Sequence, residues 1–437
     1  MERYGNGRTA DQDGQDGRDG QAGGGGRCGP GGPAAGAEEG GRRGPGTGGA
    51  RPAAPAPARA ARSGPAPGGA APGAAAPAPG RAGAAAPAPG PARPGARRAY
   101  IGSFTSAGGR GVTAADVDAR TGALTPTGST GAVADPSFLA LRPDAAVLYA
   151  VSETDDGAVA AFDVTGPAPR LIGAPEPVRG SAPTHLAYTA GHVVAAHYGS
   201  GAVSAQPVRP DGAPGPVTGL VRHRGGGPDP DRQAAPHAHQ VRPAPDGRFL
   251  LTVDLGTDSV RVCALDAGTG ALTVRAETAL RPGSGPRHLA FHPSGGHAYV
   301  LGELAPTLTV CRWDGRAGTL EPVAEVPVRP AGAAGPGYPS ALAVSPDGRF
   351  VWAAVRGDDT IAVLELDEGG ERPRLVAAVP SGGRWPRDLA ADPEGRRLYV
   401  ANERSGDVTW FDVDPETGVP SRTGAVAAPA ASCVVLA

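Results

Sequence analysis

The chain has 437 residues and a formal net charge of −2 at pH 7, from 41 basic and 43 acidic side chains. Every basic side chain is an arginine, and the lack of lysine excludes Schiff-base chemistry and a Walker-type phosphate loop. The four cysteines are far apart without paired metal spacing, which argues against a disulfide framework or zinc site and favours a reducing cytoplasm as the location. They are Cys28, Cys263, Cys311 and Cys433.

Residues 1–98 consist almost wholly of Gly, Ala, Pro, Arg and a few acids, with no aromatic residue after Tyr4 and no Leu, Ile or Val. Such a segment cannot bury enough apolar surface to offset chain entropy, so we expect a disordered tail. Its 13 arginines and 7 acids give +6, which leaves −8 for the remainder. A mildly acidic folded part argues against a nucleic-acid partner. No run approaches the length of a membrane span, so we expect no membrane partner.

From residue 99 onward, short apolar strands alternate with Gly, Pro and Asp turns, a pattern typical of all-β proteins. Six segments share a proline start and follow one another at 47, 53, 50, 53 and 47 residues, the period of a four-stranded propeller blade. They begin at Pro136-Ser137-Phe138-Leu139, Pro183-Thr184-His185-Leu186, Pro236-His237-Ala238-His239, Pro286-Arg287-His288-Leu289, Pro339-Ser340-Ala341-Leu342 and Pro386-Arg387-Asp388-Leu389.

The two ends of this region supply a seventh unit. Residues 99–130 hold only a second, third and fourth strand, and the missing first strand is found at Ser432-Cys433-Val434-Val435-Leu436. Pairing the two ends would close the ring and remove exposed sheet edges. The sequence therefore predicts an all-β, seven-bladed β-propeller over residues 99–437, closed by its N- and C-terminal strands and preceded by the disordered tail.

In such a ring the starts of first strands and the ends of second strands meet on one face, where loops surround the central axis. Charged and histidine side chains are concentrated at these positions, so we expect the functional site there. They are Thr184, His185, His237, His239, Arg287, His288 and Arg387 from the starts, and Glu153, His197, Asp254, Glu303, Arg356 and Glu403 from the ends.

Several short motifs, in this order along residues 98–437, resemble the lactonase family of seven-bladed propellers. The motifs are Tyr100-Ile101-Gly102-Ser103-Phe104-Thr105, His237-Ala238-His239, Asp254-Leu255-Gly256-Thr257-Asp258, Gly285-Pro286-Arg287-His288 and Ala401-Asn402-Glu403. The family includes propeller-type 6-phosphogluconolactonases and carboxy-cis,cis-muconate lactonising enzymes. One departure is His197-Tyr198-Gly199-Ser200, where relatives usually have Asn-Tyr-Gly-Ser.

The resemblance implies a site that combines a histidine, a glutamate and two arginines. The corresponding catalytic positions are His239, with His237 as the alternative, Glu303, Arg287 and Arg387. From their place on the same face we expect further substrate contacts from His237, Asp254, Glu153, Glu403 and His185.

Lactone hydrolysis needs a water, a base near neutral pH and positive charge for the developing oxyanion. Histidine suits the base, with activity falling on the acid side near pH 6 to 7 for an unperturbed group of about that pKa. Arginine can hold a carboxylate or phosphate through its bidentate fork. A rival hypothesis is a metal held by His237 and His239 with Glu303 or Asp254, because alternate strand residues share a face.

We therefore predict a metal-independent lactonase without a cofactor, acting as a monomer on a small anionic sugar lactone, with 6-phosphogluconolactone favoured. Within enzymes, the alternative is a carboxymuconate-type lactonising cycloisomerase. Outside enzymes, it is a non-catalytic propeller that binds a ligand or a protein on the same face. A protein-binding face would favour exposed aromatic side chains, and the whole chain has only 4 Trp, 8 Tyr and 7 Phe.

Overall fold

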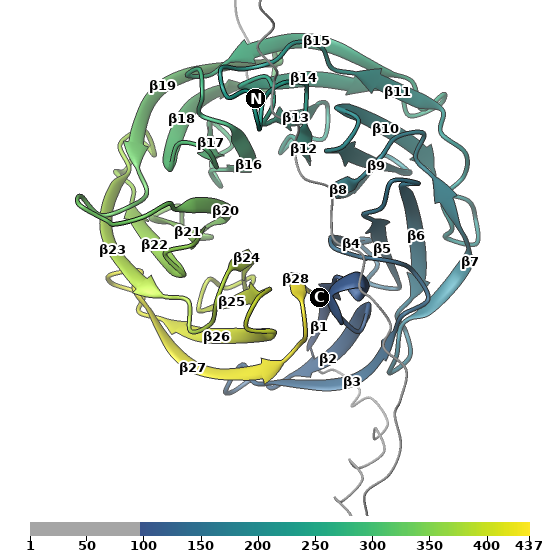
Figure 1. Ribbon diagram of the computed structural model, residues 1–437, viewed down its shortest axis with the longest axis horizontal. Coiled ribbons are helices and arrows are strands. Elements are labelled where there is room, and N and C mark those ends of the chain that lie inside the picture. The colour runs from purple at the N-terminus through teal and green to yellow at the C-terminus, as the bar shows by residue number, and fades with distance from the viewer. Residues whose placement is uncertain (1–96) are drawn as a thin grey trace, which may run out of the picture. The chain divides into compact units, whose positions relative to one another are not determined.

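The computed structural model describes residues 97–437, shown as coloured ribbon in Figure 1. Residues 1–96 of the predicted disordered tail (residues 1–98) lie outside the described residues. The last two residues of that tail, Arg97 and Arg98, belong to the first strand, where they pair with Val117 and Asp116. The folded part therefore begins two residues before the expected boundary, because these backbone groups complete a sheet ladder.

Seven four-stranded antiparallel sheets stand around a common axis, which confirms the predicted seven-bladed propeller (Figure 1). The innermost strands are β4 (Leu139–Leu141), β8 (Pro183–Thr189), β12 (Ala238–Pro243), β16 (Pro286–Phe291), β20 (Tyr338–Val344), β24 (Pro386–Ala391) and β28 (Ala431–Leu436). The second strands are β5 (Val147–Ser152), β9 (His192–His197), β13 (Leu250–Asp254), β17 (His297–Gly302), β21 (Phe350–Arg356), β25 (Arg397–Asn402) and β1 (Arg97–Ser103).

The two outer strands of each blade complete the sheets. The third strands are β6 (Ala158–Asp163), β10 (Ala202–Pro207), β14 (Ser259–Leu265), β18 (Thr307–Asp314), β22 (Thr360–Glu365), β26 (Asp407–Val413) and β2 (Val112–Val117). The outermost strands are β7 (Arg170–Pro177), β11 (Gly219–Arg222), β15 (Leu272–Ala279), β19 (Thr319–Pro327), β23 (Arg374–Pro380), β27 (Pro420–Ala427) and β3 (Leu124–Thr130). A single 3-10 turn, η1 (Thr105–Ala107), follows β1 among the described residues.

The ring closes between the two ends of the chain. Strand β28 pairs antiparallel with β1, with Val435 opposite Tyr100 and Val434 opposite Ile101. In Figure 1 the yellow β28 lies inside the blue β1, β2 and β3 of the same blade. The predicted closure is confirmed, and it gives the blade of β1, β2 and β3 the same four strands as the other six blades.

The core lies between neighbouring blades rather than inside any one sheet. One cluster joins Tyr299 and Leu301 of β17 to Val351 and Ala353 of β21, all fully buried. Because each sheet is covered on both faces, strands such as β5 and β21 are buried along their whole length. Their sequences are continuous apolar runs instead of the alternating pattern of a half-exposed strand.

A repeated hydrogen bond also joins neighbouring blades. An aromatic side chain of a second strand donates to the carbonyl of a glycine in the next blade, and each of these glycines has a positive φ. The pairs are Tyr149 with Gly212, Tyr299 with Gly370, Trp352 with Gly418 and Tyr399 with Gly122. Positive φ is a conformation that glycine adopts at little cost, and it turns the carbonyl toward the neighbouring ring. Within residues 97–437, no helix is long and apolar enough to cross a membrane.

Candidate functional site

Six of the seven innermost strands, all except β4, have a register shift near their starts, as a β-bulge produces. In β12, Ala238 pairs with Asp254 and Gln240 with Val253, so His239 has no partner in the ladder. The pairing of the other innermost strands skips residues in the same way. The residues without a ladder partner are Thr184, Arg287, Arg387 and Ser432, together with two residues in β20. A bulge bends the strand and aims the extra side chain differently from its neighbours. The bulges therefore gather these side chains around the axis at one end of the ring.

A small cavity lies among these bulged residues. The centre of a water molecule can occupy about 10 Å³ of it, which is room for about one water. Its lining contains three of the four predicted catalytic residues, together with Glu153. The lining residues are Ser137, Phe138, Glu153, Thr184, His239, Arg287, His288, Arg387, Asp388 and Ser432.

Glu303, the fourth predicted catalytic residue, lies at the end of β17 among three guanidinium groups. Its Oε2 is 3.1 Å from Nε of Arg287 and 2.7 Å from Nη2 of Arg356, and its Oε1 accepts from Nη2 of Arg232 at 2.7 Å. Burial raises the pKa of Glu303, but Arg356 and Arg287 outweigh burial and hold it well below its usual range. Glu303 is therefore a permanent anion that orients arginines and is poorly suited to carry a proton.

Arg287 is committed to the same cluster. In addition to its ion pair with Glu303, it donates from Nη1 to the carbonyl oxygen of Ser340 in the next blade, and only 4% of its side chain is exposed. Burial and the neighbouring Arg356 lower the pKa of Arg287 to about 9, which leaves the guanidinium charged at neutral pH. A fixed positive charge therefore lines the cavity.

Arg387, from the bulge of β24, lies between two carboxylates. Its Nη1 donates to Glu403 at 3.2 Å, its Nη2 is 3.7 Å from Glu153, and its guanidinium lies over the ring of Phe104. Burial raises the pKa of Glu153, while Arg387 and a hydrogen bond from Ser137 oppose the rise. Burial likewise raises the pKa of Asp388, so the cavity lining holds two carboxyl groups, Glu153 and Asp388, that keep a proton more readily than an exposed carboxyl.

The structure separates the two histidines of the predicted pair. His239 lies in the cavity lining, and its Nδ1 is buried without a hydrogen-bond partner among residues 97–437. His237 precedes β12; its Nδ1 lies 2.8 Å from the carbonyl of Tyr198, and its ring stacks on that tyrosine. Burial and then Arg287 hold the pKa of His239 well below its ordinary value. The imidazole is therefore neutral near pH 7.

Asp254 lies away from the cavity and is fully buried. Its Oδ1 accepts from the backbone N–H of His237 at 2.9 Å and of Thr257 at 3.1 Å. Its Oδ2 lies 2.6 Å from Nδ1 of His223 and 3.6 Å from Arg261. These partners occupy both oxygens, so Asp254 ties the start of β12 to the preceding loop and has no oxygen left for a substrate.

His185 also lies outside the cavity lining. The bulge at Thr184 turns its ring onto Phe138, with centroids 3.9 Å apart, and its other neighbour is His288 at 5.5 Å. Burial holds the pKa of His185 well below the ordinary value. Its position supports the packing beneath the cavity rather than a contact with substrate.

A model of the family described as "Lactonase, 7-bladed beta-propeller" matches residues 98–436, the whole described propeller except its end residues. The chain belongs to this family. The 6-phosphogluconolactonase of Bacillus subtilis (strain 168) is 32% identical over 327 residues, which cover 73% of this chain and 92% of that protein.

Two solved structures of the same fold are similar along nearly their full length. One, from Bacteroides fragilis NCTC 9343 and provisionally named a 6-phosphogluconolactonase, has a TM-score of 0.74 and 28% identity and covers 79% of this chain and 98% of that chain. The other is the periplasmic gluconolactonase of Pseudomonas aeruginosa, with a TM-score of 0.73 and 27% identity. The match covers 78% of this chain and 98% of that chain. These relatives support a lactonase activity, and their names differ in whether the lactone is phosphorylated.

In this lactonase-family propeller, sequence analysis missed a series of bonds that links the innermost strands from β8 to β28. Side chains of one strand bond to the backbone of the next: Thr184 to the His239 carbonyl, Gln240 to the Leu289 N–H, Arg287 to the Ser340 carbonyl, Ser340 to the Pro386 carbonyl and Asp388 to the Val434 N–H. One sequence signal could have pointed to Asp388. It directly follows Arg387 in the repeat, at the position that His288 occupies after Arg287 in an earlier blade. Arg232 comes from a loop without periodicity, so no pattern pointed to it.

The metal hypothesis had rested on His237 and His239 sharing a face. Both rings contact Tyr198, but Nδ1 of His237 lies 2.8 Å from the Tyr198 carbonyl oxygen, whereas His239 is the bulged residue that lines the cavity. Among residues 97–437, no group of three or more His, Cys, Asp or Glu is arranged to hold a metal ion. Cys263, Cys311 and Cys433 are buried free thiols.

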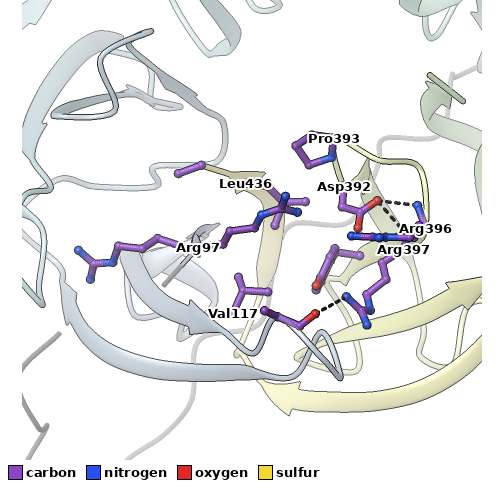
Figure 2. A pocket seen from close by; sticks show the side chains of 11 residues that line it. Arg97, Val117, Asp392, Pro393, Arg396, Arg397 and Leu436 are labelled. Atoms are coloured by element: carbon purple, nitrogen blue, oxygen red, sulfur yellow. Dashed lines mark hydrogen bonds between the residues drawn. The ribbon is translucent and has the colours of Figure 1, made fainter. Parts of the chain in front are cut away.

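A larger cavity, of about 130 Å³ on the same measure, lies at the opposite ends of β24 and β28 (Figure 2). Figure 2 shows Arg97, Arg396 and Arg397 around it, together with Asp392. Arg397 is already bonded to Asp412 and to the carbonyls of two residues in the turn after β2. Asp392 accepts hydrogen bonds from the backbone N–H groups of Arg396 and Arg397. The charged groups around this cavity are therefore bonded to other protein groups, and we do not assign the functional site to it.

Proposed function

We propose that this chain hydrolyses a lactone that carries an anionic group, with 6-phosphogluconolactone as the favoured substrate. The observation that carries the proposal is the cavity that brings neutral His239 together with charged Arg287 and Arg387. The name of the Bacillus subtilis relative supports the same substrate.

In the proposed reaction, a water molecule attacks the lactone carbonyl carbon while the neutral imidazole of His239 accepts its proton. The carbonyl oxygen becomes an oxyanion, which Arg287 stabilises through guanidinium N–H groups in a site with little solvent, while Arg387 binds the anionic substrate before the attack. When the tetrahedral intermediate collapses, the bond from carbon to the ring oxygen breaks. The leaving alkoxide takes a proton back from the imidazolium, so the product is the open-chain hydroxy acid.

The two glutamates differ in their proposed roles. Glu303 is bound by three arginines and holds Arg287 and Arg356 in place. Glu153 lines the cavity beside Arg387, and its raised pKa makes it a carboxyl that can assist transfer of the proton. Glu153 is therefore better suited than Glu303 to take part in the proton transfer.

Purified full-length chain should be assayed with 6-phosphogluconolactone and with unphosphorylated gluconolactone, after subtraction of spontaneous hydrolysis. We expect a higher kcat/KM on the phosphorylated lactone and no change on treatment with a chelator. His239→Ala should reduce turnover by about 10²- to 10⁴-fold. Full activity of the His239→Ala, Glu303→Ala double variant would refute the site. Loss of activity on chelation would support the metal hypothesis instead.

The monomeric state and the cytoplasmic location expected from the sequence stay predictions. Gel filtration of the purified chain and fractionation of the source cells would test them separately.

A further inference from the structure

The connection between β11 and β12, residues 223–237, is the longest link between blades in the described propeller. It has 15 residues, whereas the other links from an outermost strand to the next innermost strand have 3 to 10. Loops of this length in a compact domain usually have a structural or binding role of their own. This one reaches the site face, because it leads directly to His237 and the bulge at His239.

The loop is held in one conformation by buried bonds. Gln233 is fully buried, and its Nε2 donates to the carbonyl of Leu255 and to Oδ1 of Asp258, each at 2.8 Å. Asp229 accepts from the backbone N–H of Arg232 at 3.0 Å and thereby closes a tight turn. The side chain next to Gln233 therefore has a defined direction, which an unanchored surface loop would not give it.

That side chain is Arg232, which extends to the carboxylate at the axis. Its Nη2 lies 2.7 Å from Oε1 of Glu303 and 3.3 Å from the hydroxyl of Tyr198, although 71 residues separate it from Glu303. Its side chain is 36% exposed, against 4% for Arg287 and 8% for Arg356. An anion arriving from solvent therefore meets Arg232 before the buried arginines.

Arg232 also keeps donors for a ligand. Within residues 97–437 its side-chain hydrogen bonds all come from Nη2, so Nε and Nη1 have no protein acceptor. Arg356, in contrast, donates from Nε and Nη2 to backbone carbonyls, and Nε of Arg287, which makes no hydrogen bond in that range, is buried rather than exposed. Three guanidinium groups face the single carboxylate of Glu303, which leaves an excess of two positive charges beside the cavity.

We propose that Arg232 and the hydroxyl of Tyr198 form a subsite for the phosphate group of the substrate, on the exposed side of Glu303, whose carboxylate also contacts Arg287 of the cavity lining. The inference rests on the proposed function and adds the residue that selects a phosphorylated lactone. A phosphate monoester offers three acceptor oxygens, which suit the planar fork of an arginine with spare N–H groups. Arg232 acts on binding and does not touch the reacting carbonyl.

The first test compares substrates. In Arg232→Ala, the ratio of kcat/KM for 6-phosphogluconolactone to that for gluconolactone should fall about 10- to 100-fold, the usual effect of losing a hydrogen bond to a charged group. Arg232→Lys should recover part of the ratio, since it keeps the charge without the fork. The matched control is Arg281→Ala, an exposed arginine paired with Glu325 on another blade, which should keep the wild-type ratio.

An equal loss on both lactones would overturn the inference, because it would show that Arg232 only supports the site. An unchanged ratio would overturn it as well.

The second test measures binding without turnover. Calorimetric titration of the wild-type chain with 6-phosphogluconate should show tighter binding than with gluconate, and Arg232→Ala should remove most of that difference. If the wild-type chain hydrolyses neither lactone, the proposed reaction fails, and this titration still decides the subsite. Equal binding of the two acids by the wild-type chain would overturn the subsite alone.

Discussion

The hydroxyl of Tyr399 in β25 donates to the carbonyl oxygen of Gly122 at 3.0 Å, across 277 residues of sequence. Gly122 has a φ of +71°, and a Cβ there would lie 2.5 Å from Cδ of Arg397. Burial raises the pKa of Tyr399 to about 12, so the hydroxyl stays a donor throughout the working range of pH. This bond joins the last full blade to the blade that closes the ring.

Tyr399→Phe should lower the free energy of unfolding by about 1 to 3 kcal/mol, because it leaves a buried carbonyl oxygen without its donor. Urea unfolding followed by circular dichroism measures the loss. Tyr338→Phe is the matched control, since no hydrogen bond from the Tyr338 hydroxyl is found within the described propeller, and it should change stability little. Equal stability of both variants would show that the bond across the closure contributes nothing.

Deletion of residues 432–437 should be far more damaging than the loss of six residues suggests. It removes nearly all of β28, including the buried Cys433 and Val434, and leaves their partner strand β1, with buried Tyr100 and Ile101, without its inner neighbour. We expect loss of cooperative thermal unfolding or a strongly lowered Tm. Deletion of Ala437 alone is the control, and an unchanged Tm in the longer deletion would contradict the closure.

Arg287→Lys should reduce kcat/KM by about 10²-fold or more, although the charge is kept. A single ammonium cannot bind Glu303 and the Ser340 carbonyl at once while it also faces the substrate. Steady-state kinetics should be paired with a melting curve, because the Ser340 bond also links two blades. Wild-type kinetics in the lysine variant would mean that only the charge matters.

His239→Ala and Arg387→Ala should differ in which kinetic constant they change. Removal of the base should lower kcat, whereas removal of an anion-binding arginine should chiefly raise KM. Both residues line the same cavity, so the pair tests a division of roles within one site. A rise in KM alone for His239→Ala would remove the histidine from the proposed proton transfer.

Much of the fold could be predicted because blade architecture repeats in the sequence. The prolines before the innermost strands and the fragment at Ser432 were enough to count the blades and to close the ring. The site residues were harder to predict, because the alternation of side chains along a regular strand does not show where a β-bulge interrupts it. The alternation placed His237 and His239 together, whereas the break in the ladder at His239 leaves only that residue in the cavity.

Two other differences between the predicted and the observed site, at Asp254 and Arg232, depend on contacts between residues far apart in the sequence. Asp254 ends a second strand, as Glu303 nearly does, yet buried His223 and two backbone N–H groups occupy its oxygens. Those partners lie up to 31 residues away, so strand position alone could not distinguish a structural carboxylate from a binding one. Arg232 reaches the site only because Gln233 is buried, a contact without any repeat in the sequence.

The last prediction concerns the dependence of the rate on pH. An unperturbed histidine base would lose activity near pH 6 to 7, as the sequence led us to expect. In the structure, burial and Arg287 favour the neutral ring and hold the pKa of His239 well below 6.5. Since the neutral ring is the active base, kcat should stay at its plateau as pH falls through 6.5 and decline only at lower pH.

The measurement is kcat from pH 4.5 to 8, with circular dichroism at each pH to separate protonation from acid unfolding. His239→Ala should lose the acid limb that belongs to this residue. An acid limb centred near pH 6.5 in the folded wild-type protein would contradict the prediction, because it would require a base in contact with solvent rather than the buried imidazole beside Arg287.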